Sequence, residues 1–144
     1  MLHRQPLKRG ESYFIPAGTL HAVSRGVVFA EVQQSSNVTY RIYDYGRRGA
    51  DGKRRALHVE QALDVTRRSP AERTADFGGH LCACRSFAVD LCAGGYDGVC
   101  GAESFVSLLV FEGAGTLENA GERMPVKKGD SLFLPAGSGA YRAA

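Results

Sequence analysis

Apolar residues alternate with polar ones, or gather in short runs, along most of this chain, and glycine, proline, serine or asparagine separates the runs. Short runs rich in β-branched and aromatic residues are typical of β-strands. Many short strands with regular turns indicate an all-β sandwich or barrel of the jelly-roll type. The predicted strands are Ser12–Ile15, Val27–Val32, Val38–Tyr43, Arg85–Leu91, Phe105–Phe111, Thr116–Glu118, Ser131–Leu134 and Ala140–Arg142.

One segment has helical spacing instead, and it predicts a single short helix near His58–Val65. The polar, glycine-rich segment Asp44–Arg55 before it is predicted to be a loop, and the charged segment Thr66–Gly79 after it a linker. One side of the helix is apolar and is therefore expected to be buried. The residues on that side are Leu57, Ala62, Leu63 and Val65.

One stretch of the sequence occurs twice. Pro6–Ala22 and Pro125–Tyr141 both contain a basic pair, glycine, an acid, serine, an apolar run and Pro-Ala-Gly. A repeat of this length predicts two copies of one structural unit. The copies differ where His21 of the first aligns with Ala140 of the second. Of these two positions, only the first could therefore hold a metal ion.

Composition narrows the class of protein only a little. The chain has 144 residues, enough for one domain with a core, and a net charge of +3, which is compatible with an anionic partner. No apolar run is long enough to span a membrane, and the first residues lack the apolar core of a signal peptide, so a cytoplasmic protein without a membrane partner is expected. The cysteines lack paired metal-ligand spacing and are interpreted as reduced thiols. They are Cys82, Cys84, Cys92 and Cys100.

The segment 41–55 carries six basic residues interleaved with tyrosines, a composition that is also found on nucleic-acid-binding surfaces. Asp44 and Asp51 interrupt the charge, and the net charge of the chain is small. A solvated loop is the usual explanation for such a run. Nucleic acid is therefore not an expected partner.

Three motifs in order closely resemble the class I mannose-6-phosphate isomerases in their shorter bacterial form. They are GESYFIPAGTLHA, AEVQQSSNVTYRIYDYGR and GKRRALHVEQALDV, and the resemblance runs from about Pro6 to Val65. It continues more weakly through FEGAGTL and VKKGDSLFLPAGSGAY, which look like the C-terminal cupin half of that family. The resemblance implies a cupin jelly roll and a zinc-dependent enzyme that interconverts mannose 6-phosphate and fructose 6-phosphate.

The resemblance also implies roles for four residues of this chain. His21 matches the last zinc ligand of the family, and Arg41 matches the arginine of its catalytic site. Glu31 lies in the active-site strand, where it would orient substrate or carry protons. Arg47 matches a basic position near the sugar phosphate. These assignments cover part of the chemistry of aldose–ketose isomerisation, which needs a positioned base and a stabilised oxyanion.

Other residues of the family's site have no counterpart here: a Gln-x-His pair and a glutamate that bind zinc, and a catalytic lysine. The chain resembles the C-terminal half of the enzyme, and a fragment without these ligands is expected to be inactive alone. We expect residues 1–55 to be the closing strands of a truncated catalytic cupin, 56–76 a helix and linker, and 77–144 a C-terminal cupin. Strand edges left open by the truncation predict self-association. The alternative is a non-catalytic cupin that binds a sugar or another chain.

Overall fold

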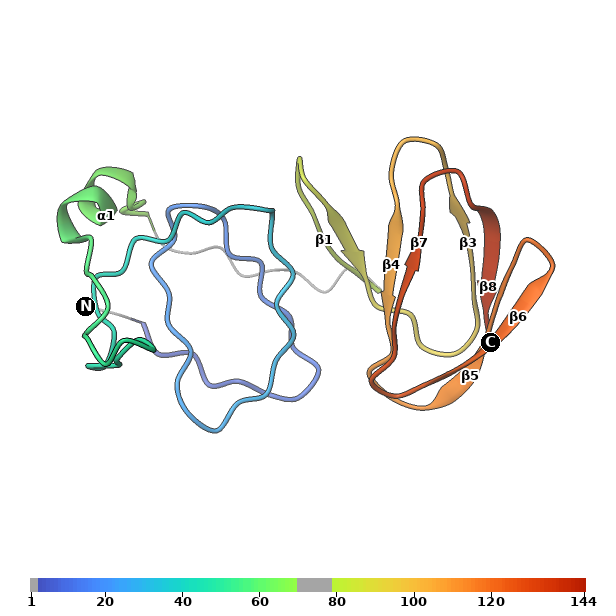
Figure 1. Ribbon diagram of the computed structural model, residues 1–144, viewed down its shortest axis with the longest axis horizontal. Helices are drawn as coiled ribbons and strands as arrows, with labels where there is room; N and C mark the ends of the chain where they lie inside the picture. Colours follow the sequence, from blue (N-terminus) through green and yellow to red (C-terminus); the bar gives the residue numbers. More distant parts are fainter. Residues whose placement is uncertain (1–2, 70–78) are drawn as a thin grey trace. The chain divides into compact units, whose positions relative to one another are not determined.

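The computed structural model describes residues 3–69 and 79–144. The chain forms two compact units, Met1–Asp90 and Leu91–Ala144. The described elements are strands with one short helix, so the predicted all-β class is confirmed (Figure 1). The predicted boundary between residues 76 and 77 lies outside the described residues. No helix in the described ranges is long and apolar enough to cross a membrane.

The second unit is a small β-sandwich. Its larger sheet has the antiparallel order β3-β8-β5-β6, and β4 pairs with β7 in a smaller sheet. Figure 1 shows these strands in orange and red at the C-terminal end of the chain. The bounds are β3 Tyr96–Cys100, β4 Val106–Leu109, β5 Ala114–Asn119, β6 Glu122–Lys127, β7 Ser131–Leu134 and β8 Gly139–Ala143.

The core of the second unit joins both of its sheets. Cys100, Leu117 and Tyr141 come from the larger sheet, and Leu134 comes from the smaller one. Alternate residues of β4 and β7 add apolar side chains to this cluster, as expected for strands with one buried face. A Cβ atom on Gly98 would lie 2.4 Å from the ring of Tyr141, so glycine allows the ring to lie flat across β3.

Four predicted strands of the second unit correspond to β4, β5, β7 and β8. The sequence pattern predicts no strand among residues 92–104, where the structure forms β3. Glycine and aspartate lower the apparent strand propensity of this segment. Pairing along its length with β8 outweighs that local preference.

The first unit contains the helix α1, Val59–Val65, and a hairpin of β1, His80–Ala83, with β2, Ala88–Asp90. The predicted helix is confirmed, but its predicted buried side is wrong for three of four residues. Ala62 is buried, whereas Leu57, Leu63 and Val65 are exposed. A helix of 7 residues has only two turns, and Ala62 is the one buried residue of α1.

The predicted strands Ser12–Ile15, Val27–Val32 and Val38–Tyr43 form no ladder in the structure. The described residues from 3 to 57 contain one isolated bridge, between Arg48 and Arg54, and otherwise follow a wide loop (Figure 1). A strand exists only when a neighbouring strand pairs with its backbone groups, and residues 3–57 do not pair with one another in this way. The apolar side chains of these runs consequently remain exposed, with Val28 fully exposed.

We expect amide protons of residues 27–32 to exchange much faster than those of β4. The backbone of β4 is paired with β7, whereas residues 27–32 form no strand. Unpaired amides exchange by local fluctuations that cost almost no free energy. Hydrogen exchange followed by mass spectrometry on the full chain measures both segments at once. Equal protection of the two segments would show that residues 27–32 are paired in solution.

Candidate functional site

The side chain of Asp44 is the buried centre of a charged cluster in the loop that follows residue 43. It is 6% exposed, and Arg55 donates to both of its carboxylate oxygens, with Nε 2.7 Å from Oδ2. Arg47 approaches the same carboxylate from the other side, with Nη2 3.1 Å from Oδ1. One acid therefore holds two guanidinium groups in place.

A tight turn brings Asp44 and Arg47 together. The backbone N–H of Arg47 donates to the carbonyl of Asp44 at 2.9 Å, and both central residues have positive φ, 54° at Tyr45 and 68° at Gly46. These angles are typical of a type I′ turn, in which glycine is favoured and a tyrosine is uncommon. Tyr45 lies beside Arg47, whose Cζ is 5.9 Å from the centroid of the ring. The turn therefore positions the guanidinium as well as the backbone.

The charges in this cluster shift one another's pKa values. The hydrogen bond from Arg55 lowers the pKa of Asp44 below its usual value, and the charges of Arg55, Arg47 and Arg41 act in the same direction. The same hydrogen bond raises the pKa of Arg55. Asp44 is accordingly ionised at neutral pH, so one carboxylate is shared by two guanidinium groups.

A small cavity of about 150 Å³ opens between the cluster and Leu57. Guanidinium groups pair with the oxygens of phosphate or carboxylate in bidentate fashion. A cavity with arginines on its wall is chemically suited to one small anionic group. Its lining residues are Tyr43, Asp44, Gly46, Arg47, Arg54, Arg55 and Leu57.

The predicted catalytic residue Arg41 lies close enough to this cluster for its charge to lower the pKa of Asp44. Its backbone is fixed by His58, whose N–H donates to the Arg41 carbonyl at 2.7 Å and whose Nδ1 lies 3.4 Å from the Arg41 nitrogen. The helix α1 begins directly after His58. Both hydrogen bonds between Arg41 and His58 use the backbone of Arg41, and neither uses its guanidinium group.

The other two residues with a predicted role in the site, His21 and Glu31, are both exposed. Nδ1 of His21 lies 2.9 Å from the carbonyl oxygen of Thr19. In the ranges 3–69 and 79–144, no group of three or more His, Cys, Asp and Glu side chains could hold a metal ion. The described residues therefore bring Arg41 and Arg47 together but do not build a ligand set around His21.

Sequence reasoning missed the roles of Asp44 and Arg55. Asp44 was considered only as a charge that interrupts a basic run, and Arg55 only as one member of that run. The signal that could have found them is an acid next to a Tyr-Gly turn in a segment with an excess of arginine. An aspartate is rarely buried unless it is paired, and in such a segment a guanidinium partner is close by in the sequence.

We expect the ordered state of this loop to depend on pH through Asp44. Because the folded pKa of Asp44 is lowered, its ion pairs stabilise the loop above the unfolded pKa, and this contribution is lost as pH falls through the folded pKa. The protection of the Arg55 side-chain Nε proton against exchange, measured by NMR relative to a free arginine at the same pH, should therefore fall below about pH 4.

The variant Asp44→Asn should show fast exchange of the Arg55 Nε proton already at neutral pH. Asp64→Asn removes an exposed carboxylate from α1 and serves as the matched control. If Asp44→Asn leaves the exchange profile of Arg55 unchanged, the pairing of these two residues does not order the loop.

Comparisons with known proteins find similarity to mannose-6-phosphate isomerases along this chain. Residues 94–143 match the family model described as mannose-6-phosphate isomerase, cupin domain. The chain is 32% identical, over an alignment of 157 residues, to mannose-6-phosphate isomerase ManA of Bacillus subtilis (strain 168), covering 99% of this chain and 48% of that protein. It is 45% identical over 75 residues to mannose-6-phosphate isomerase of Streptococcus mutans, covering 51% of this chain and 24% of that protein.

A solved structure is similar as well. It is the crystal structure of mannose 6-phosphate isomerase from Bacillus subtilis, with a TM-score of 0.57 and 28% identity, covering 75% of this chain and 38% of that chain. Together with the family match, this similarity confirms the predicted cupin fold. The chain spans about half the length of the Bacillus subtilis relatives that it matches.

Proposed function

Because this chain is a relative of the mannose-6-phosphate isomerases and carries their cupin domain at residues 94–143, we propose that it contributes to the interconversion of mannose 6-phosphate and fructose 6-phosphate. The observation that carries the proposal is the similarity to the ManA protein of Bacillus subtilis along 99% of this chain. Since the chain spans about half of that relative, the proposed activity belongs to a protein in which both halves of the relative are present.

The arginine cluster supports a sugar phosphate as the substrate. Asp44 holds Arg55 and Arg47 beside a cavity of suitable size for one anionic group. We assign the phosphate of the substrate to this cavity, with Arg47 in the role predicted from the sequence. Preorganised guanidinium groups lose less side-chain entropy on binding than free ones do, which favours affinity for the phosphate.

The proposed reaction moves a proton from C2 of the aldose to C1 of the ketose through an enediol. In this scheme Glu31 carries the proton, and Arg41 stabilises the negative charge that develops on the substrate oxygen. Arg41 suits its role because its guanidinium is not used by the hydrogen bonds to His58.

Zinc is expected from the family, but the described residues by themselves do not fit a zinc site, which takes three or four ligands. One feature of His21 suits a ligand. Its Nδ1 lies beside a backbone carbonyl, which is the partner that metal-binding histidines commonly use to orient Nε2. We therefore propose His21 as one ligand of a site whose other ligands lie outside the described residues, and we derive no step of the reaction from the metal.

The function is tested by fusing this chain to the N-terminal half of the Bacillus subtilis relative. The fusion is expected to interconvert the two sugar phosphates, whereas this chain alone is expected to have no activity. A coupled assay for fructose 6-phosphate measures both proteins. A folded fusion that binds mannose 6-phosphate without turnover would favour the alternative, a non-catalytic cupin module, which the arginine cluster also supports.

Zinc content gives a separate prediction. The fusion should retain about one zinc ion per chain after desalting, and His21→Ala should remove most of it. His3→Ala replaces another exposed histidine and should change nothing. Elemental analysis of the desalted proteins measures the difference. Full zinc retention by the folded His21→Ala protein would contradict the assignment of His21.

A further inference from the structure

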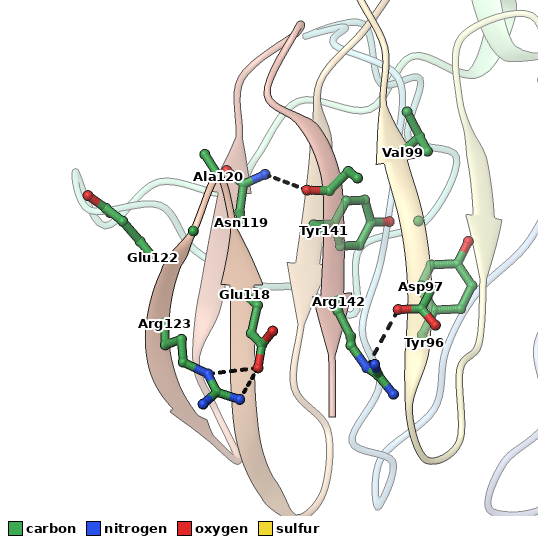
Figure 2. Close-up of a pocket in the computed structure, with 13 residues that line it drawn as sticks. Tyr96, Asp97, Val99, Glu118, Asn119, Ala120, Glu122, Arg123, Tyr141 and Arg142 are labelled. Atoms are coloured by element: carbon green, nitrogen blue, oxygen red, sulfur yellow. Dashed lines mark hydrogen bonds and ion pairs between the residues drawn. The ribbon is translucent and has the colours of Figure 1, made fainter.

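The outer face of the larger sheet in the second unit carries a row of four charged residues, one taken from each strand, in register. Asp97 of β3 is paired with Arg142 of β8, Arg142 with Glu118 of β5, and Glu118 with Arg123 of β6. These four residues form a row across the sheet, called the charge row below. Its signs alternate from one edge of the sheet to the other, as Figure 2 shows.

The charge row contains two ion pairs, and three of its four side chains remain mostly exposed, Glu118 being the exception. Arg123 pairs with Glu118, and Arg142 pairs with Asp97 through Nε, 3.6 Å from Oδ1. The side chains of Asp97 and Arg123, at the two ends of the row, are 76% and 74% exposed. A carboxylate accepts several hydrogen bonds and a guanidinium donates five, so each end of the row can accept a second partner of opposite sign.

An apolar strip runs beside the charge row, formed by Val99, Ala120, Gly121 and Ala140. Val99 is 74% exposed, and the other three residues are small. Figure 2 shows Val99 and Ala120 above the row, at opposite sides of the sheet. Both features border a hollow of about 740 Å³. Small residues in a strip allow another backbone to approach closely.

A polar small molecule is a poor occupant for this hollow. The amide of Asn119 is already used, since its Nδ2 donates to the carbonyls of Ser138 and Ala140 at 2.9 and 3.0 Å. The charged groups are distributed along a line rather than converging on one point, as a ligand site requires. A protein surface whose charges alternate in sign with the same spacing is a better partner for the charge row.

We infer that this face binds the same face of a second copy of the chain. A two-fold axis parallel to the strands, through the middle of the sheet, reverses the order of the row. Asp97 then faces Arg123 of the partner subunit, and Arg142 faces Glu118 of the partner subunit. All facing charges have opposite sign, so the row is complementary to itself.

The apolar strip obeys the same symmetry. The axis places Ala140 against Ala120 of the partner subunit and Val99 over the partner's Gly121, so apolar residues meet apolar residues. An axis along the row would instead put each charge against its own copy. Charge alternation thus selects one orientation, in which two sheets pack face to face in the aligned manner common in β-sandwiches. Exposed ion pairs contribute little each, so a weak, salt-sensitive dimer is expected.

The test inverts the row in the full-length chain. Arg142→Glu places a negative charge against Glu118 of the partner subunit and should shift sedimentation from dimer to monomer. The inverted quadruple variant, D97R/E118R/R123E/R142E, keeps every pair within the sheet and the alternation, so it should again form dimers. Mixed with labelled wild-type chain, it should not form heterodimers, because every facing pair then has like charge.

Lys128→Glu is the matched control, since it changes an exposed residue in the turn after β6 by the same charge and should leave the dimer intact. The wild-type dimer should dissociate as sodium chloride rises towards about 0.5 M, because salt screens exposed charges. A monomeric wild-type chain at high concentration and low salt would overturn the inference. So would self-association unaffected by Arg142→Glu, because the contact would then lie on another surface of the chain. Activity enters none of these readouts, so the outcome is independent of the proposed function.

Discussion

Replacing Leu117 by alanine is expected to lower the free energy of unfolding of the second unit by about 2–5 kcal/mol. Leu117 is 4% exposed and lies in the cluster formed with Cys100, Leu134 and Tyr141. Truncation removes buried methyl groups and leaves a cavity that rigid strands cannot close. The loss is large compared with the whole stability of a typical domain, about 5–15 kcal/mol.

Urea unfolding followed by circular dichroism in the strand region measures this loss, because most paired strands belong to the second unit. Leu109→Ala is the matched control. Leu109 lies on β4 of the same sandwich but is 48% exposed, so its truncation should cost less than about 1 kcal/mol. Equal losses for the two variants would show that the core is not centred on Leu117.

Arg41→Ala is expected to lower turnover of the fusion about 10²–10³-fold, the usual cost of removing one group that stabilises a developing oxyanion. Thermal stability should hardly change, because the backbone of Arg41, not its side chain, forms the hydrogen bonds to His58. Steady-state kinetics with mannose 6-phosphate separate the two effects. The loss should appear in kcat, whereas Arg47→Ala, at the proposed phosphate position, should mainly raise KM.

Arg25→Ala is the control for a general loss of positive charge, since Arg25 is an exposed arginine with no assigned role. Its kinetics should match those of the unmodified fusion. An Arg41→Ala fusion with normal kcat would remove Arg41 from the catalytic assignment. A large fall in melting temperature would instead identify it as a residue needed for folding.

Local sequence was a good guide where a segment with a strand or helix pattern also finds a partner in its own unit. Ser131–Leu134 was predicted as a strand with the same bounds that the structure shows, and α1 begins one residue after the predicted start. In such segments local propensity and tertiary pairing agree. The Pro-Ala-Gly repeat and the motifs around His21 were likewise sufficient to identify the relationship that the comparisons confirm.

Sequence reasoning was wrong where pairing depends on a distant partner. Val27–Val32 has an excellent strand pattern, yet no ladder forms there, because residues 3–57 do not pair with one another in ladders. The opposite error occurred at residues 96–100, where a glycine-containing segment became β3 because β8 lies alongside it. A pattern of side chains says which segments can be strands, but backbone pairing between distant segments decides which ones are.

The sequence by itself determined the fold class and the resemblance to mannose-6-phosphate isomerases, because these follow from local patterns and motifs. The candidate residues His21, Glu31, Arg41 and Arg47 follow from that resemblance. Only the tertiary structure decided that Arg55 returns to the carboxylate of Asp44, 11 residues earlier in the chain, and holds it together with Arg47. The alternating charge row is also a tertiary property, since its four members come from four strands. In both cases the physical reason is the same. The charged residues are apart in the sequence, and a turn or the register between paired strands brings them together.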